Sequence, residues 1–435
     1  MSHYKPYPAY RDSGVEWIGQ VPEHWQVTPL KVIAGTVNGA TPESGKPEYW
    51  DGDIAWYTPT DIDNEVASEL GAPRRYITQA GYESCAVKLS PPGSVILSTR
   101  APIGSVGTTT IPSTINQGCR TLIPAQDVPT SYLASTLVAA REELRLRGNG
   151  TTFQELSTEA LRSLRVPMPP RSECVSIACG LDRETTRIDA LIAKKTRFIE
   201  LLKEKRQALI THAVTKGLDP DVKMKDSGVE WIGEVPEHWV AIKFNHVARV
   251  TEGLVDPKDH PYRDMVLVAP NHIESGTGKI LGLETAVAQN AESGKYTCKK
   301  GAVIYSKIRP ALAKVAIAPC DCLCSADMYP MDCTDLSYPE WLFYLMLSPP
   351  FTSWAILESD RVAMPKINRE SLADLRVFLP PMEEQLAAVE WLKIQLQKLE
   401  KVSLATQRSI DLLKERRAAF ITAAVTGQID LRESA

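Results

Sequence analysis

Apolar residues recur at a seven-residue spacing in two stretches of the chain. The first stretch contains Leu181, Ile188, Leu202 and Leu209, and the second contains Leu392, Leu399, Leu413 and Phe420. Lys195 and Thr406 occupy the missing steps. This spacing is typical of long helices that pair along an apolar stripe. Because Pro-Pro pairs precede both stretches, at residues 169–170 and 380–381, each helix is expected to start there.

Each predicted helix has about 42 residues, which gives a length of roughly 60 Å. One small domain cannot cover a helix of that length. We therefore expect the two helices to pack on each other as a coiled coil. The alternative is that each helix buries its stripe on its own globular domain.

The regions before the two helices have a mixed pattern. Short apolar runs bounded by Gly and Pro, such as Ser94–Ser98 and Ala302–Ser306, predict strands. The run from Tyr132 to Gly148 and the run from Pro339 to Pro349 predict helices. The globular parts are therefore expected to be mixed α and β.

The chain contains an internal repeat. DSGVEWIGQVPEHW begins at Asp12 and DSGVEWIGEVPEHW begins at Asp226, while LRSLRVPMPP from Leu161 corresponds to LADLRVFLPP from Leu372. LLKEKRQALITHAVTKGLD from Leu201 likewise matches LLKERRAAFITAAVTGQID from Leu412. The segments between these anchors are much less alike. We expect one scaffold built twice with different surface chemistry, and the endings VTKGLD and VTGQID suggest a circular arrangement that places the two chain ends near one another.

Length and composition fit this two-part plan. The chain has 435 residues, with 43% hydrophobic and 23% charged, which is the composition of a folded protein. It shows neither a signal peptide nor a membrane-spanning run, so a cytoplasmic location is expected. The nine cysteines are interpreted as free thiols. The net charge of −4 argues weakly against nucleic-acid binding, because proteins that bind DNA alone are usually basic.

One motif is compatible with catalysis. Ser348–Phe351 matches the [DNS]-PP-[YFW] loop with which amino-methyltransferases hold a flipped adenine. No Gly-rich turn for S-adenosylmethionine precedes it, so we interpret SPPF as a helix stop. We identify no catalytic residues.

No metal site is expected either. Cys320, Cys322 and Cys324 form a C-x-C-x-C run, which could bind zinc but equally fits one face of a strand. His24 and His238 both lie in the repeated PEHW motif, where a structural role is the simpler interpretation.

The repeated motifs resemble those of a known family. The duplicated SGVEWIGQVPEHW motif, the strand ILSTRAPIG followed by INQGCRTLIP, the LRSLRVPMPP run and the helix ending in LLKEKRQALITHAVTKG together resemble the specificity subunit of type I restriction-modification systems. The resemblance covers nearly the whole chain. It implies an α+β fold of two tandem homologous mixed α/β DNA target recognition domains, separated by two long helices that form an antiparallel coiled coil with pseudo-two-fold symmetry.

The resemblance also implies domain limits. We expect target recognition domain 1 at residues 1–168, a central long helix at 169–216, target recognition domain 2 at 217–379, a C-terminal long helix at 380–427 and a tail at 428–435.

The implied function is recognition without catalysis. Each domain would read one half of a bipartite, asymmetric site on double-stranded DNA. Modification subunits, two per chain, would carry S-adenosylmethionine and methylate adenine at N6, while restriction subunits would join them. This chain itself would hold no cofactor. The modification subunits could also supply much of the phosphate contact that an acidic chain lacks.

Basic and polar residues on expected loops are the candidates for base contact. In the first domain they are Lys46, Thr60, Asp61, Arg74, Arg75 and Arg100, and in the second they are Asn271, His272, Lys307 and Arg309. Basic residues on the helices are candidates for contact with the DNA spacer or a partner subunit: Lys203, Lys205, Arg206, Lys414, Arg416 and Arg417. Solvated surface charge or internal ion pairs explain any one of them equally well.

Two other functions remain open at this point. One is an S-adenosylmethionine-dependent DNA methyltransferase that uses Ser348–Phe351. The other is a coiled-coil scaffold that reads no DNA.

Overall fold

The structure is a computed structural model that describes residues 4–62, 68–100, 102–148, 154–229, 232–359 and 365–432. It divides into two compact units. Unit 1 comprises Met1–Lys195 and Arg408–Ala435, and unit 2 comprises Thr196–Gln407. Each unit therefore contains the start of one long helix and the end of the other.

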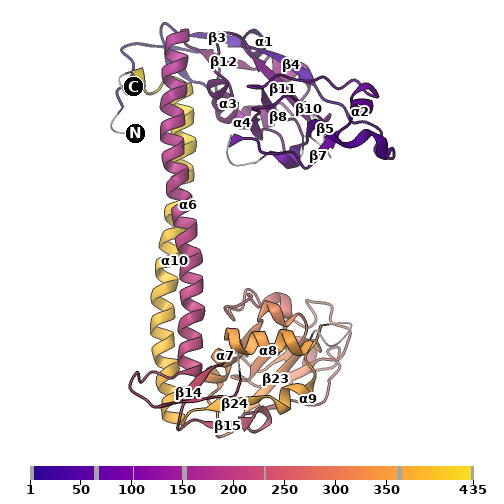
Figure 1. The fold of residues 1–435 in the computed structure, drawn as a ribbon, viewed down its shortest axis with the longest axis vertical. Helices are drawn as coiled ribbons and strands as arrows, with labels where there is room; N and C mark the ends of the chain where they lie inside the picture. The colour runs from indigo at the N-terminus through magenta and orange to yellow at the C-terminus, as the bar shows by residue number, and fades with distance from the viewer. Residues whose placement is uncertain are drawn as a thin grey trace. The chain divides into compact units, whose positions relative to one another are not determined.

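The two long helices confirm the sequence prediction. They are α6 (Arg171–Thr215) and α10 (Met382–Val425) (Figure 1). Within unit 1, Asp189 of α6 bonds to Arg417 of α10, whereas Gly180 lies against Leu431, just beyond the end of α10. From Asp189 back to Gly180 in α6, the partner residue advances from Arg417 to Leu431. The two segments therefore run antiparallel.

The helix segments in unit 2 follow the same pattern. Ala213 of α6 lines one pocket with Ala388 of α10, and Arg206 interacts electrostatically with Glu400. The helix pairing within each unit is therefore antiparallel.

Burial along the helices follows the predicted stripe most closely near the globular parts. Leu181, Ile188 and Leu392 are at most 4% exposed, whereas Leu202 and Leu209 are half-buried. Leu181 shares one core with residues of the sheet and helices of unit 1, and Leu392 does so in unit 2. The helix ends therefore pack both on each other and on a globular part, so the two modes of packing weighed from the sequence occur together.

Two sheets in the described part of unit 1 have three or more strands. The larger has strand order β4-β11-β8-β9-β6, and the smaller has order β10-β5-β7. The strands are β4 Ala34–Asn38, β5 Trp50–Tyr57, β6 Ser68–Glu69, β7 Arg75–Ile77, β8 Val95–Ser98, β9 Val106–Thr108, β10 Ser113–Ile115 and β11 Cys119–Pro124. All four residues of β8 are buried, as expected for a continuous apolar run in the middle of a sheet.

The helices of the globular part of unit 1 are short. They are α1 Leu30–Ile33, α2 Gln79–Glu83, α3 Thr130–Ala139, α4 Arg141–Leu146 and α5 Thr158–Arg162. The sequence predicted one helix from Tyr132 to Gly148, but the structure has two, because Ala140 leaves the helical conformation with a ψ of 6°. Leu137 and Leu144 nevertheless belong to the same core, so the break redirects the chain without exposing its apolar face.

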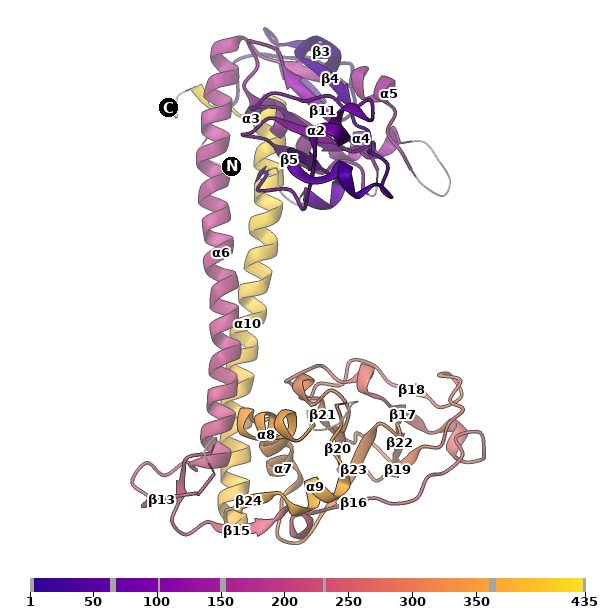
Figure 2. The same cartoon turned by 45° about the vertical axis from the view of Figure 1, so that its right-hand side comes forward.

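Unit 2 repeats this plan. Its sheets have strand orders β16-β23-β20-β21 and β18-β17-β22-β19 (Figure 2). The strands are β16 Ala248–Val250, β17 Val266–Val268, β18 Glu284–Thr285, β19 Tyr296–Cys298, β20 Val303–Ser306, β21 Val315–Ile317, β22 Cys322–Cys324 and β23 Met328–Cys333, and the short helices are α7 Pro339–Leu347, α8 Pro349–Ser359 and α9 Arg369–Asp374. Strand β20 again lies between β23 and β21, as β8 lies between β11 and β9, so the expected duplicated scaffold is confirmed.

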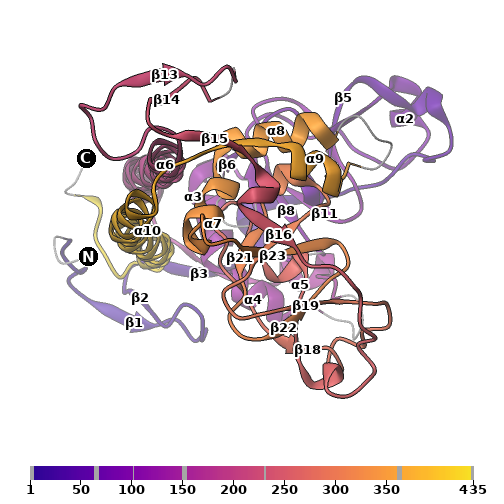
Figure 3. The ribbon, with the colours of Figure 1, turned by 90° about the horizontal axis from the view of Figure 1, so that it is seen from below.

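Short ladders flank the long helices in both units. In unit 1, β1 Tyr10–Asp12 pairs with β2 Gln20–Pro22, and β3 Gln26–Pro29 pairs with β12 Arg165–Met168. In unit 2, β13 Met224–Asp226 pairs with β14 Glu234–Pro236, and β15 Val240–Lys243 pairs with β24 Arg376–Leu379. The β13–β14 ladder lies beside the end of α6 (Figure 3).

The PEHW motif fixes the start of α6. Glu173, in the first turn of α6, accepts hydrogen bonds from His24 Nε2 at 2.8 Å and from Trp25 Nε1 at 2.9 Å. The Trp25 side chain is 1% exposed, and a carboxylate in the first turn also favours the helix N-terminus electrostatically. We call this arrangement the clasp of unit 1.

The second PEHW motif forms the clasp of unit 2. Glu384, in the first turn of α10, accepts hydrogen bonds from His238 Nε2 at 2.6 Å and from Trp239 Nε1 at 3.0 Å. The structural role expected for His24 and His238 is therefore what the structure shows. No helix in the described ranges is long and apolar enough to cross a membrane.

The chain ends meet within unit 1. Asp430 N donates to Lys5 O at 2.8 Å, and the Tyr10 hydroxyl donates to Gly427 O at 3.0 Å. In unit 2 the residues that correspond to both ends form one continuous segment, Lys216–Asp226. The proximity of the chain ends fits the circular arrangement suggested by the repeated endings.

Loss of charge in the two clasps should have unequal effects. The Glu173 side chain is 9% exposed and that of Glu384 is 43% exposed. We expect Glu173→Gln to lower the free energy of unfolding by about 2 kcal/mol and Glu384→Gln by about 1 kcal/mol, because buried charge-assisted hydrogen bonds are worth more. Thermal unfolding of both variants checks the order, and equal losses would contradict the role assigned to burial.

A circular permutant should also fold. We expect a chain that starts at Pro220, close to Asp226, and joins residue 432 to residue 4 through a short Gly-Ser linker to unfold with the cooperativity of the parent. The control permutant starts at Leu97, inside buried strand β8, and should not fold. Circular dichroism during heating distinguishes them, and failure of the first permutant would contradict the circular arrangement.

Candidate nucleic-acid interface

Three loops of unit 1 meet at one edge. Strands β5 and β10 are parallel, with Tyr57 opposite Ile115, so both end at the same side of their sheet. The 3-10 turn Pro59–Asp61 follows β5, and the turn that contains Gly118 follows β10. A Cβ atom on Gly118 would lie 3.0 Å from Pro59 Cγ and 3.4 Å from Arg100 Nε. We call this place the loop edge of unit 1.

Thr60 and Asp61 have different roles in this edge. Thr60 is exposed, and its Oγ1 lies 2.8 Å from Thr58 Oγ1. The Asp61 carboxylate accepts from Thr58 N at 2.8 Å, Thr58 Oγ1 at 2.7 Å and Arg74 N at 3.1 Å, and its side chain is 5% exposed. This corrects the expectation that Asp61 is available to a base, because its acceptors already close the turn.

Arg100 is the cation most closely associated with the loop edge. It is half-buried, and no described residue forms a hydrogen bond or ion pair with it. Burial lowers the pKa of the neighbouring Arg120, and the charge of Arg100 lowers it further, while Glu155 raises it. Burial also raises the pKa of the Cys119 thiol. Arg100 is thus a guanidinium without a protein partner among the described residues, which suits it to an external anion or base.

The remaining basic candidates of unit 1 belong to the smaller sheet and its approach. Arg75 stacks on the Trp50 ring, with its Cζ 3.5 Å from the ring centroid. Lys46 pairs with Glu43 at 3.2 Å and lies 5.3 Å from the Tyr49 ring centroid. Arg74 is 74% exposed, with its Nε 3.9 Å from Asp61. Lys46 and Arg75 are therefore held by neighbours, whereas Arg74 is largely solvated.

Unit 2 builds an equivalent turn with different side chains. Strands β17 and β22 are parallel, with Val268 opposite Cys324, and the 3-10 turn Pro270–His272 follows β17. Ala269 N donates to His272 Nδ1 at 3.1 Å, as Thr58 N donates to Asp61. His272 Nδ1 therefore closes this turn as the Asp61 carboxylate closes the turn of unit 1, and Asn271 is exposed like Thr60.

The basic residues after β20 differ in position from Arg100. Lys307 N donates to Asp327 O at 3.0 Å, and Thr99 N makes the matching bond to Gly118 O at 2.8 Å. Lys307 thus corresponds to Thr99, and Lys307 and Arg309 lie on either side of the position that corresponds to Arg100. Lys307 Nζ lies 5.2 Å from the Tyr329 ring centroid.

Arg309 lies two residues beyond Lys307 in the same loop. It is exposed and has a left-handed φ of 49°, a backbone conformation that non-glycine residues seldom adopt. The turn that follows holds this conformation because Leu312 N donates to Arg309 O at 3.0 Å.

Two arginines at these edges were missed from the sequence. Arg120 Nε donates to Thr158 Oγ1 at 2.9 Å, and Arg369 Nη2 donates to Thr251 O at 3.0 Å and Tyr296 Oη at 3.1 Å. Both are fixed by these bonds and hold loops in place. Arg120 could have been noticed because it directly follows the Gln-Gly-Cys turn of the resemblance motif, but no local signal marks Arg369.

The helix candidates separate into surface and interior residues. The exposed ones are Lys203, Lys205, Lys414 and Arg416. Arg417 is 7% exposed and bonds to both carboxylate oxygens of Asp189, at 2.9 and 3.2 Å. Arg206 donates to Thr277 O at 3.2 Å, and burial lowers its pKa. These contacts correct the surface placement of Arg206 and Arg417, which instead join parts within their own units.

The SPPF motif lies in the core. Ser348 ends α7, and its hydroxyl donates to Leu345 O at 2.6 Å. Phe351 is 5% exposed and packs edge-on against Tyr305, with ring centroids 5.5 Å apart. The expected helix stop is present, although Pro349 also starts α8, a position that proline favours. A phenylalanine buried in this way presents no face to a flipped base.

Two of the three cysteines of the C-x-C-x-C run are strand residues, whereas Cys320 precedes the strand and is half-buried. Cys322 and Cys324 are fully buried in β22, and Cys322 lies opposite Cys298 of β19. Within the described ranges, no group of three or more His, Cys, Asp or Glu side chains is arranged to hold a metal ion.

Comparison with known proteins agrees with this architecture. The family model of the type I restriction modification DNA specificity domain matches residues 22–201 and 236–407. The type I restriction enzyme EcoDI specificity subunit of Escherichia coli is 32% identical over 273 residues, which are 59% of this chain and 61% of that protein. The MjaIX specificity subunit of Methanocaldococcus jannaschii is 26% identical over 431 residues, 96% of each chain.

Solved structures share the fold. A structure that describes complex assembly and conformational transition of the type I R-M system has a TM-score of 0.68 at 15% identity, over 93% of this chain and 98% of that one. The HsdS subunit from Thermoanaerobacter tengcongensis has a TM-score of 0.51 at 15% identity, over 94% and 98%. The fold is thus that of tandem mixed α/β domains separated by long helices. The chain belongs to the family of type I restriction-modification DNA specificity domains, which confirms the resemblance found in the sequence.

The two residues of the unit 1 turn should separate stability from recognition. We expect Asp61→Ala to destabilise unit 1 by about 2 kcal/mol, because it leaves Thr58 N and Arg74 N without their acceptor. The neighbouring Thr60→Ala is the matched control and should change stability by less than about 0.5 kcal/mol, since Thr60 is exposed. Thermal unfolding checks both, and a large loss in Thr60→Ala would contradict the division.

Proposed function

We propose that this chain is the DNA sequence-specificity subunit of a type I restriction-modification complex, in which each unit reads one half of a bipartite, asymmetric target. One observation carries the proposal. The two units place an exposed residue at the same position of the same turn, but the residue is Thr60 in unit 1 and Asn271 in unit 2. Equal scaffolds with unequal hydrogen-bonding groups are what two different half-sites require.

The two loop edges also offer different cations. Unit 1 presents Arg100, while unit 2 presents Lys307 and Arg309. An arginine can donate two parallel hydrogen bonds to guanine, whereas a lysine acts more as a point charge. Arg120 and Arg369 hold these loops in place. Several of their N–H groups already donate hydrogen bonds to protein oxygens and are not available to a base. Base reading is therefore assigned to the exposed turn residues and loop cations.

Partner subunits would dock on the long helices. Unit 1 exposes Leu191 and Leu412, which are 41% and 63% exposed, and unit 2 exposes Leu201 and Val402, at 45% and 43%. The repeat relates Leu191 to Val402 and Leu201 to Leu412. Two equivalent apolar surfaces suit two copies of one partner. We assign them to two modification subunits that carry S-adenosylmethionine, with restriction subunits joining the assembly.

The chain itself would perform no chemistry in this assembly. The buried position of Phe351 removes the observation that favoured an S-adenosylmethionine-dependent methyltransferase. Methylation of adenine at N6 would belong to the modification subunits. The exposed helix residues Lys203, Lys205, Lys414 and Arg416 would contact either the DNA spacer or those subunits.

The decisive experiment maps methylation. The chain is co-expressed with the modification subunit encoded beside it, and single-molecule sequencing of the host genome is expected to show one asymmetric, gapped motif. Replacement of residues 12–168 by those of a relative should change one half of the motif only. If the assembled complex with S-adenosylmethionine methylates no motif, the proposal fails and a scaffold that reads no DNA is the better account.

Single substitutions sharpen this test. We expect Asn271→Ala to relax the half-site read by unit 2, with roughly tenfold or greater loss of discrimination at one base pair and no change in the other half. Arg100→Ala should do the same for the half-site read by unit 1. Lys31→Ala, an exposed basic residue outside the loop edge, is the control and should leave both halves unchanged. An effect of Asn271→Ala on both halves alike would contradict separate reading.

A further inference from the structure

The two clasps are completed differently. In unit 1, the Tyr7 hydroxyl donates a third hydrogen bond to Glu173 at 3.2 Å, and Arg432 Nη1 lies 3.6 Å from the same carboxylate. The Arg432 guanidinium also bonds to both oxygens of Asp430 and lies 4.8 Å from the Tyr7 ring centroid. Hydrogen bonding from Arg432 lowers the pKa of Asp430. The space around the clasp of unit 1 is thus filled by the two ends of the chain.

In unit 1, the first and the last segment of the chain both lie at the clasp. In unit 2, the single segment Lys216–Asp226 takes the place of both. Asp221 N bonds to Asp219 Oδ1 at 2.9 Å, as Arg432 N bonds to Asp430 Oδ1 at 3.0 Å. Asp221 therefore takes the backbone position of Arg432. The same residue corresponds to Tyr7 when the PEHW motifs are aligned, so one aspartate stands where unit 1 has both an aromatic ring and a guanidinium.

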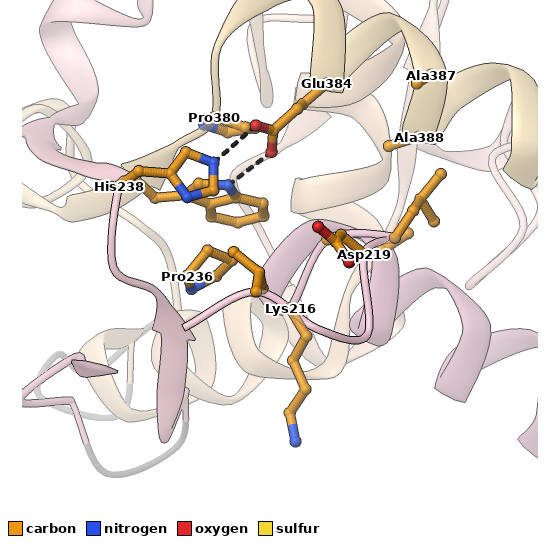
Figure 4. A pocket seen from close by; sticks show the side chains of 13 residues that line it. Lys216, Asp219, Pro236, His238, Pro380, Glu384, Ala387 and Ala388 are labelled. Carbon is orange, nitrogen blue, oxygen red and sulfur yellow. Dashed lines mark hydrogen bonds and ion pairs between the residues drawn. The ribbon is translucent and has the colours of Figure 1, made fainter. Parts of the chain in front are cut away.

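A pocket remains at this place in unit 2. It has a volume of about 260 Å³, and its lining includes Lys216, Asp219, His238, Trp239 and Glu384. Glu384 and Asp219 lie on different sides of it, and the Lys216 side chain extends away (Figure 4). The Glu384 side chain is 43% exposed, against 9% for Glu173.

The charge of the pocket follows from this substitution. Unit 1 balances Glu173 and Asp430 with Arg432, whereas unit 2 replaces that arginine by a third carboxylate, Asp221. No described lysine or arginine forms an ion pair with Asp219 or Glu384; the ion pair of Glu384 is with His238. The clasp of unit 2 therefore lacks the guanidinium group that Arg432 supplies in unit 1.

We propose that this pocket binds an arginine side chain of a partner polypeptide, whose guanidinium joins Glu384 to Asp219 as Arg432 joins Glu173 to Asp430. Arginine fits better than lysine because its planar group can serve two carboxylates at once. The apolar walls formed by Pro236 and Ala388, with the buried Trp239 behind them, suit the aliphatic part of the same side chain. The site is independent of DNA reading, so it stands or falls separately from the proposed function.

The test uses the full chain labelled with 5-fluorotryptophan. Trp239 lines the open pocket and Trp25 lies in the filled one, so the two fluorine resonances, assigned with Trp239→Phe and Trp25→Phe, serve as reporter and internal control. We expect the peptide acetyl-Gly-Arg-Gly-amide to shift the Trp239 resonance saturably and to leave Trp25 unmoved. The peptide with citrulline, which has nearly the same shape but no charge, should shift neither.

Two variants make the result specific. Asp221→Arg supplies a guanidinium within the chain and should abolish the response of Trp239, while unmoved resonances of Trp341 and Trp354, in the core of unit 2, show that this unit is still folded. Asp219→Asn keeps the turn but removes one charge and should weaken binding roughly tenfold. The proposal is overturned if Trp239 does not respond, if citrulline or Mg²⁺ gives the same shift, or if Asp221→Arg leaves the response unchanged.

Discussion

The structure depends on one interaction that occurs twice, a carboxylate in the first turn of each long helix held by a histidine and a tryptophan. A helix N-terminus leaves unpaired N–H groups and favours negative charge, so Glu173 and Glu384 stabilise the helix starts. Their bonds to His24–Trp25 and His238–Trp239 tie each start to the ladder that precedes the globular part. Because each helix then passes from one unit into the other, a single contact sets the direction of an element that both units share.

Duplication in a linear chain has a geometric consequence. One copy of the scaffold contains the first and last segments of this sequence, and the other contains the connection between copies. Unit 1 therefore has two overlapping terminal segments at its clasp, while unit 2 has only Lys216–Asp226. Leu431 packs on Gly180 in unit 1, whereas unit 2 has Pro220 and the bulky Trp391 at the corresponding positions. The two copies thus differ also where the chain begins and ends, although their anchor sequences are nearly the same.

The sequence predicted those features that depend on periodicity and repetition, namely the long helices, strands such as β8 and the doubled scaffold. It did not predict the tasks of single polar residues, because those depend on contacts distant in sequence. Asp61 and Arg417 looked like surface groups until Thr58, Arg74 and Asp189 were placed beside them.

This division between structural and free positions explains how one scaffold can serve different recognition chemistry. The turn after β5 needs an acceptor at its third position, and a carboxylate in Asp61 or an imidazole nitrogen in His272 meets that need equally. The position before it makes no bond that the turn requires, so Thr60 and Asn271 can differ without loss of stability. Under the proposed function, selection for a new DNA sequence would act on a residue whose replacement leaves the fold unchanged, as long as the acceptor beside it is retained.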